Sequence, residues 1–205
     1  MGVEQITQWD TRYAGEDYVF GTAPNAFLAA QARRLRPGWK ALAIADGEGR
    51  NGVWLAGQGL AVTSLDASRT AQEKAQRLAE ARGVELQLEL ADIEEWDWPR
   101  GRFDVVVGIF IQFASPDLRA GIFSGMKRSL RPGGLALLEG YRPEQIAYGT
   151  GGPKIPEQLY TIELLQAAFA DFEILELRAY DAEIQEGKGH SGMSALIDLV
   201  ARKVG

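Results

Sequence analysis

The sequence contains no cysteine and only one histidine, His190. The absence of cysteine excludes disulfide bonds, thiolate metal ligands and a cysteine nucleophile. With a single imidazole, a metal site built on several histidines is excluded as well. We therefore expect no metal among the ligands of this chain.

Long apolar runs and strong basic clusters are missing too. No stretch approaches the roughly 20 apolar residues that a membrane-spanning helix requires, and the polar N-terminal segment MGVEQITQWDTRYAGEDY differs from a signal peptide. Acidic residues number 28 against 22 basic ones, a formal charge of −6, and no basic cluster exceeds a dipeptide. These features favour a cytoplasmic protein that binds neither duplex nucleic acid nor a membrane.

What is present is the pattern of an α/β domain. The chain has 205 residues, of which 46% are hydrophobic and 24% charged, as in an ordinary folded domain. From about residue 39 onward strand-like and helix-like segments alternate, which is typical of a parallel sheet with helices on both faces. The expected strands cover residues 39–45, 60–65, 85–90, 103–110, 135–140, 172–180 and 194–203. The last two have no helical pattern between them, so we expect an antiparallel pair at the sheet edge.

The expected helices cover residues 24–36 and the segment up to about residue 58, and three more begin after Ser68, at Pro116 and after Thr161. Serine and threonine accept hydrogen bonds from the first turn of a helix, and proline suits its first position. Residues 141–160 form a long loop rich in glycine, proline and tyrosine, with no apolar period. A compact domain usually keeps such a loop for a lid or for ligand binding.

A glycine-rich segment, Asp46-Gly-Glu-Gly-Arg-Asn-Gly52, joins the first predicted strand to the next helix. Glycine lets the backbone approach a ligand closely, and the helix start leaves N–H groups free for an anion. Residues 47–52 match the pattern G-x-G-x-x-G, although such a match alone is weak. The alternative is a tight turn between strand and helix.

Two acidic positions strengthen the first interpretation. Asp66 ends the second predicted strand, 19 residues after Gly47, where a carboxylate can accept hydrogen bonds from ribose hydroxyls. Asp92 and Ile93 follow the third strand, where they can address an adenine. The alternatives are an acid at a helix N-terminus and a solvated loop acid. Together, the loop and the spaced acid predict an adenosine-type nucleotide at the carboxyl ends of the strands.

A nicotinamide-dependent dehydrogenase would fit these features as well. However, the chain has no Tyr-x-x-x-Lys pair to handle a carbonyl, and it offers no second domain for a hydride acceptor. Instead, FDVVVGIF at residues 103–110 is followed by a helix, the turn LRPGG, a strand and the terminal antiparallel pair.

That order resembles the class I S-adenosylmethionine-dependent methyltransferases, and within them the small bacterial branch related to tellurite-resistance and thiopurine methyltransferases. The resemblance covers residues 9–203. It is carried by WDTRYAGEDYVFGTAPNAFL (9–28), DGEGRNGVWLA (46–56), VTSLDAS (62–68), FDVVVGIF (103–110), LRPGGLALLEGY (130–141) and AYGTGGP (147–153).

The resemblance implies a Rossmann-like, doubly wound sheet of seven strands in the order 3-2-1-4-5-7-6, with strand 7 antiparallel. It implies one domain over residues 1–205, with an N-terminal cover segment 1–38, and S-adenosyl-L-methionine as cofactor, converted to S-adenosyl-L-homocysteine. By resemblance, the cofactor contacts are Arg12, Asp46, Gly47, Glu48, Gly49, Asn51, Asp66, Ala67, Asp92, Ile93, Ile109 and Phe110. Arg12 would pair with the methionine carboxylate, which arginine matches bidentately; the alternative is a surface arginine on a packed N-terminal arm.

The first motif departs from the family's common form. Ala43 stands where an acid is common, and Ala45 replaces the first glycine. Alanine is small enough to allow close approach, so we expect cofactor binding to survive. Asp46 is a candidate to replace the missing acid.

The implied reaction is in-line methyl transfer to a small nucleophile, a thiol, a chalcogen or an amine. A base is needed only where the nucleophile arrives protonated, and the candidates are His190, Tyr148 and Glu139. The alternatives are an NAD(P)-dependent Rossmann oxidoreductase and a non-catalytic protein that only binds S-adenosylmethionine. We expect a monomer or a homodimer.

Overall fold

The computed structural model describes residues 2–205, and Met1 of the predicted cover segment lies outside them. The described chain divides into two compact units. The first runs to Asp97 and includes Glu186–Gly189, and the second comprises Trp98–Gln185 and His190–Gly205. The single domain over residues 1–205 stays a prediction.

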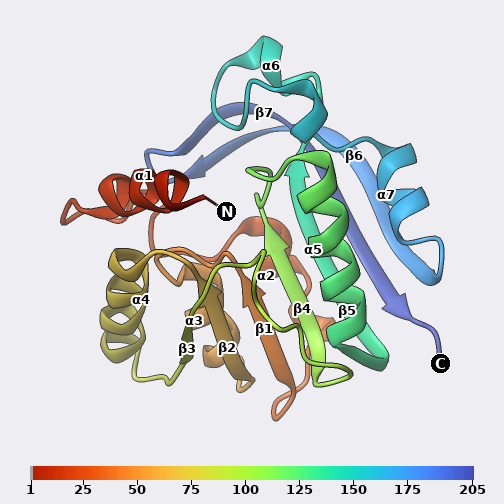
Figure 1. Cartoon of the computed structure of the whole chain (residues 1–205), viewed down its shortest axis with the longest axis horizontal. Helices are drawn as coiled ribbons and strands as arrows, with labels where there is room; N and C mark the ends of the chain where they lie inside the picture. Colours follow the sequence, from red (N-terminus) through yellow and green to blue (C-terminus); the bar gives the residue numbers. More distant parts are fainter. Residues whose placement is uncertain (1) are drawn as a thin grey trace. The chain divides into compact units, whose positions relative to one another are not determined.

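The first unit holds three parallel strands and the helices that precede and connect them (Figure 1). β1 pairs with β2, and β2 with β3, all in parallel. The last four residues of β1, Ala41 to Ile44, are buried, as expected of an apolar run inside a parallel sheet. Its elements are α1 (Val3–Tyr13), α2 (Ala26–Ala30), η1 (Ala32–Arg34), β1 (Lys40–Ile44), α3 (Arg50–Gly57), β2 (Ala61–Asp66), α4 (Arg69–Arg82) and β3 (Gln87–Leu90).

Helix α4 shows how local sequence sets these bounds. The Ser68 hydroxyl accepts a hydrogen bond from the Ala71 N–H at 3.1 Å, and Gly83 ends the helix in the left-handed conformation. The apolar stripe of α4, formed by Ala71, Ala75, Leu78 and Ala79, is buried. Lys74 lies among these buried residues, which the stripe alone did not reveal. Helix α4 packs against α1 and α3.

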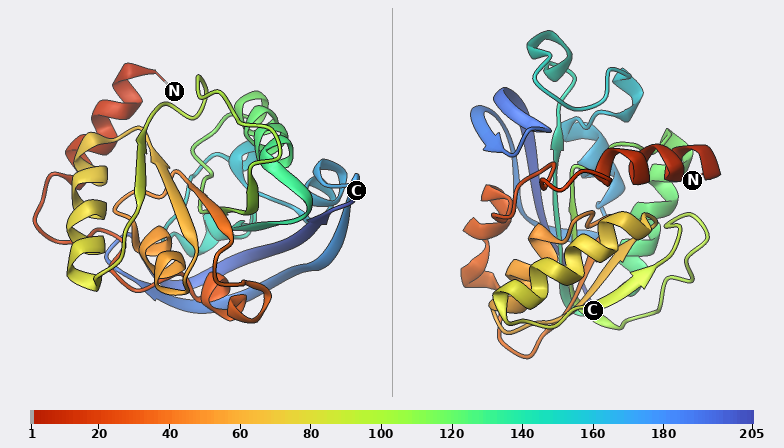
Figure 2. Two further views of the ribbon diagram at one scale, coloured as in Figure 1. Left: turned by 90° about the horizontal axis from the view of Figure 1, so that it is seen from below. Right: turned by 90° about the vertical axis from the view of Figure 1, so that its left-hand side faces the viewer.

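The second unit contains β4, β5, β7 and β6, which are coloured from green to blue in Figure 2. Every residue of β4 is buried, β4 and β5 are parallel, and β5 and β7 are antiparallel, with Leu138 opposite Leu199. Its elements are β4 (Phe103–Ile109), α5 (Pro116–Ser129), β5 (Leu130–Tyr141), α6 (Gln145–Tyr148), η2 (Pro156–Gln158), α7 (Ile162–Ala168), β6 (Phe172–Glu186) and β7 (His190–Lys203).

The strand order is β3-β2-β1-β4-β5-β7-β6, which confirms the predicted α/β sheet and its antiparallel strand 7. Several local predictions need correction. β6 and β7 reach to within three residues of each other, so His190 is the first residue of β7 and not part of a long loop. The predicted helix 24–36 is two short turns, α2 and η1, and the loop 141–160 contains α6 and η2. Helix α1 was not expected from its polar sequence.

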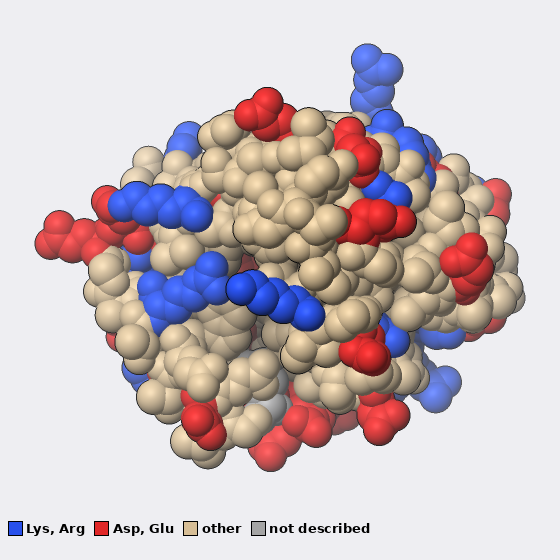
Figure 3. Space-filling view, turned by 90° about the horizontal axis from the view of Figure 1, so that it is seen from above, with Lys and Arg blue, Asp and Glu red and all other residues tan. Residues whose placement is uncertain are grey.

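Charges of both signs are interspersed on the face seen in Figure 3, in keeping with the absence of basic clusters from the sequence. No helix within residues 2–205 is long and apolar enough to cross a membrane.

The junction of loop and helix at Gly49 gives a first prediction. Gly49 has a φ of +84°, and a Cβ there would lie 2.6 Å from the Ala75 Cβ. We expect Gly49→Ala to lower the free energy of unfolding by roughly 2–4 kcal/mol, from backbone strain and overpacking. Urea titration measures it.

Gly57, at the other end of α3, is the matched control because no atom lies within 4 Å of a Cβ built there. Gly57→Ala should raise the free energy of unfolding by up to about 1 kcal/mol through helix propensity. Equal effects of the two substitutions would contradict the close packing of the loop on α4.

Candidate active site

The loop of residues 46–52 leaves β1 and becomes the N-terminus of α3. Ala45, Gly47 and Gly49 have positive φ angles of 46°, 57° and 84°, which fold the chain into a tight turn. The Asp46 carboxylate points into the protein, where it accepts a hydrogen bond from the Ser64 hydroxyl at 2.8 Å and from the Gly52 N–H at 3.2 Å. Asp46 therefore fastens the far end of the loop to β2.

Burial raises the pKa of Asp46 to about 7, although the hydrogen bonds from Ser64 and Gly52 oppose this. Removing a carboxylate from water disfavours its charged form. Asp46 therefore binds a proton in the folded protein more tightly than in the unfolded chain.

Asp66 stands at the end of β2 and holds the start of the same loop. Its two oxygens accept hydrogen bonds from the Gly47 N–H and the Ser68 N–H, both at 2.8 Å. Burial raises its pKa to about 6. A carboxylate offers about four acceptor positions, so Asp66 retains capacity for further hydroxyl donors. This arrangement fits the ribose diol of the cofactor that the sequence predicts.

The neighbouring positions form the turn after each strand. The Ala67 N–H lies near the Asp66 carboxylate and helps to stabilise its charge. Asp92 follows β3, and its side chain accepts a hydrogen bond from the Glu94 N–H at 3.0 Å. Ile93 is buried beside it. The adenine contact of Asp92 and Ile93 stays a prediction.

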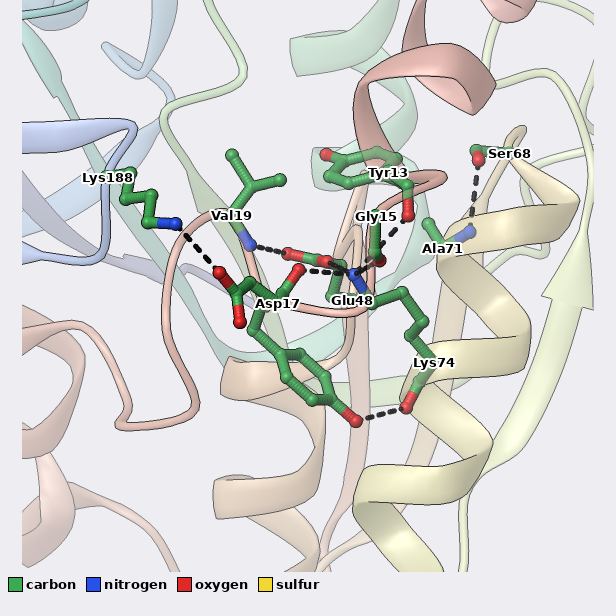
Figure 4. Close-up of polar contacts among 10 residues, drawn as sticks. Tyr13, Gly15, Asp17, Val19, Glu48, Ser68, Ala71, Lys74 and Lys188 are labelled. Carbon is green, nitrogen blue, oxygen red and sulfur yellow. Dashed lines mark hydrogen bonds and ion pairs between the residues drawn. The ribbon is translucent and has the colours of Figure 1, made fainter.

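Two predicted cofactor residues use their side chains to hold the N-terminal arm, here defined as residues 13–25. Glu48 forms an ion pair with Lys74 at 2.5 Å and accepts a hydrogen bond from the Val19 N–H at 2.7 Å (Figure 4). Asn51 accepts a hydrogen bond from the Asn25 N–H at 2.9 Å. Both carboxylate oxygens of Glu48 are thus engaged, so any contact of Glu48 with a cofactor would come from its backbone.

The arm and the helix before it lie against the loop. The Tyr13 hydroxyl oxygen lies 2.9 Å from where a Cβ of Gly47 would be. The exposed Arg12 has its guanidinium between the rings of Trp9 and Phe20, at 5.1 and 5.0 Å from their centres. Its pairing with a methionine carboxylate stays a prediction.

In the second unit, three rings meet after β4. Ile109 ends the strand, and Phe110 follows with a φ of 54°. The Phe110 ring stacks on Tyr141 at 4.6 Å and on His190 at 4.3 Å between ring centres. The Tyr141 hydroxyl and the His190 Nδ1 share a hydrogen bond. The only imidazole of the chain is thus paired with a buried phenol.

Gln112 fixes the backbone that presents Tyr141. Its side chain accepts a hydrogen bond from the Tyr141 N–H at 2.6 Å and donates one to the Tyr141 carbonyl at 2.8 Å. Gly140 is required beside it, because a Cβ there would lie 2.8 Å from the Gln112 amide carbon.

The other two predicted bases lie in different surroundings. Glu139 faces Asp198 across the β5–β7 pair and accepts a hydrogen bond from the Tyr180 hydroxyl at 3.3 Å. The Tyr148 hydroxyl donates to Asp181 at 2.9 Å, and this bond raises the pKa of Tyr148, which keeps the phenol protonated and so less available to accept a proton. Of the three candidates, only His190 belongs to the ring cluster with Phe110.

Three residues of these clusters are not among the predicted cofactor contacts and bases. Lys74 could have been suspected, since it lies three residues after Ala71 and four before Leu78, inside the apolar stripe of α4. Tyr141 was assigned only to a loop that could close. Nothing in the local sequence marks Gln112 as the residue that braces Tyr141.

Comparison with known proteins bears on the class of domain and on the fold. Residues 41–134 match a family model described as a methyltransferase domain. No curated protein matches the sequence. Among solved structures, one from work on the conversion of a disulfide bond into a thioacetal group during echinomycin biosynthesis is 24% identical, with a TM-score of 0.76, over 97% of this chain and 92% of that one.

TehB from Haemophilus influenzae is 19% identical with a TM-score of 0.72, over 95% of this chain and 65% of that one. A methyltransferase from Methanosarcina mazei, described as dependent on S-adenosylmethionine, is 18% identical with a TM-score of 0.70, over 89% and 99%. At these identities the likeness concerns the fold. The domain match and the fold together support the class that the sequence predicts, the class I S-adenosylmethionine-dependent methyltransferases.

The raised pKa of Asp46 predicts a pH dependence of stability. Between about pH 4 and 7 the unfolded chain releases a proton that the folded protein keeps. The contribution of Asp46 is therefore full below about pH 4 and is lost as the pH rises through 7. Asp46→Asn keeps the shape but removes the titration, so at pH 8 it should raise the free energy of unfolding by on the order of 1–3 kcal/mol.

Urea unfolding of the ligand-free protein at pH 4, 6 and 8 measures this difference. The two proteins should converge in stability toward pH 4. A variant that is less stable than the wild type at pH 8 would show that the charged carboxylate stabilises the loop.

Proposed function

We propose that this protein transfers the methyl group of S-adenosylmethionine to a small-molecule nucleophile by in-line displacement. The observation that carries the proposal is the loop 46–52, held by Asp46 and Asp66 at the carboxyl ends of β1 and β2. Bound there, S-adenosylmethionine supplies a methyl group already activated on a sulfonium. The protein's own part is orientation and exclusion of water, which can supply several kcal/mol.

The first unit would bind the cofactor. Gly47 and Gly49 allow backbone approach, the α3 N-terminus offers N–H groups to the methionine carboxylate, and Asp66 accepts from the ribose hydroxyls. Arg12 and Tyr13, at the end of α1, would cover the loop from the arm side. These assignments follow the resemblance and agree with the positions of the side chains.

The ring cluster of Phe110, Tyr141 and His190 would serve the methyl acceptor. If the His190 Nδ1 proton is donated to the Tyr141 oxygen, Nε2 presents a lone pair that can take a proton from the nucleophile. An amine needs such a base, whereas a thiol or a reduced chalcogen ionises more readily. We propose a small acceptor, with no role for nucleic acid or membrane, in a cytoplasmic protein.

Calorimetric titration of S-adenosylmethionine tests the cofactor. We expect micromolar binding to the wild type and at least tenfold weaker binding to Asp66→Ala, a loss of about 1.4 kcal/mol or more. NADH is the control ligand and should not bind. Binding of NADH in place of S-adenosylmethionine would favour an oxidoreductase.

Turnover of a panel of small thiols and amines tests the base. His190→Ala should lower amine methylation by about 100-fold near neutral pH and thiol methylation much less. Tyr141→Phe removes the partner of the imidazole and should shift the pH at which the rate rises. An unchanged rate of His190→Ala at every pH would exclude the base role.

A further inference from the structure

Lys74 is a buried cation on α4 with only 2% of its surface exposed. Its Nζ donates to three backbone carbonyls, those of Tyr13 at 3.3 Å, Gly15 at 2.9 Å and Asp17 at 2.6 Å. The fourth oxygen around it belongs to the Glu48 carboxylate at 2.5 Å. Figure 4 shows these oxygens converging on one ammonium group.

The Lys74 ammonium supplies hydrogen-bond donors to backbone carbonyls at the end of α1. The last carbonyls of a helix have no partner within it, and Tyr13 is the last residue of α1. Buried carbonyls without a donor are costly, and so is a buried ammonium without an acceptor. One lysine satisfies both needs, and the arm therefore turns around Lys74 where α1 ends.

Glu48 carries the effect of Lys74 into the loop that the proposed function assigns to the cofactor. One of its oxygens pairs with Lys74 and the other accepts from the Val19 N–H at 2.7 Å. The Tyr18 hydroxyl returns to the Lys74 carbonyl at 3.1 Å. The arm is thus bonded on both sides of one buried ion pair, and one member of that pair is a loop residue.

We propose that Lys74 is a positioning residue that keeps the arm closed on the loop 46–52, acting through Glu48 and without touching the cofactor. Cofactor affinity then depends on this lysine, a consequence that rests on the proposed function. The role of Lys74 in keeping the arm closed does not depend on the proposed function.

Two measurements on Lys74→Ala test the proposal. Hydrogen exchange without any cofactor should show the Val19 N–H and its neighbours in the arm exchanging at least tenfold faster, while β4 and β5 stay protected. Titration should show S-adenosylmethionine binding at least tenfold more weakly. Propylammonium chloride, which replaces the missing carbons and the N–H donors, should restore both, whereas tetramethylammonium chloride at the same concentration should not.

Lys188→Met is the matched control, because Lys188 pairs with Asp17 of the same arm at 2.7 Å but both side chains are exposed, at 81% and 78%. Exposed pairs of this kind contribute little, so this variant should behave as the wild type. An effect as large as that of Lys74→Ala would overturn the special role of the buried lysine.

If Lys74→Ala does not fold, the double variant Lys74→Met with Glu48→Met is used to test the proposal. A buried ion pair is often replaced by apolar residues without loss of stability, so this variant is expected to fold. It should fold with an arm that exchanges rapidly. A protected arm in either folded variant, or release that propylammonium does not reverse, overturns the proposal. Failure of the wild type to bind S-adenosylmethionine would instead contradict the proposed function. The hydrogen-exchange measurement would then test by itself whether Lys74 holds the arm.

Discussion

The conformation of the loop after β1 is held by buried carboxylates. These carboxylates are removed from water and accept hydrogen bonds from the protein's own donors. Asp46 binds the Gly52 N–H, Asp66 binds the N–H groups of Gly47 and Ser68, and Glu48 binds that of Val19. Each carboxylate joins two segments that are distant in sequence. Burying an acid is unfavourable unless donors surround it, so the shape of the loop and the positions of these acids determine each other.

The two units use different chemistry to hold their candidate residues. In the first, carboxylates accept hydrogen bonds from backbone N–H groups, and burial raises the pKa values of Asp46 and Asp66. In the second unit, aromatic rings and a side-chain amide hold the candidate residues: Phe110 stacks on His190, and Gln112 holds the backbone of Tyr141.

Sequence patterns predicted what local rules control. The mostly apolar run of β4 and the serine cap of α4 each depend on residues close together in the chain, and the structure confirms both elements. The orientation of side chains depends on partners far away. Glu48 looks like a loop residue facing a ligand, but a lysine 26 positions later holds it. Glu139 looks like a free acid at a strand end until β7 brings Asp198 opposite. Such pairings arise only from the assembled sheet.

Ala45 and Phe110 are the two residues other than glycine with positive φ among the described residues, at 46° and 54°. Each is the first residue after a parallel strand, Ala45 after β1 and Phe110 after β4. A side chain in this conformation costs on the order of 1–2 kcal/mol, and such strain persists only where surrounding contacts impose it. Asp46 and Asp66 impose it beside Ala45, and the rings of Tyr141 and His190 impose it on Phe110. The strain thus falls where the chain leaves the sheet and the candidate residues begin.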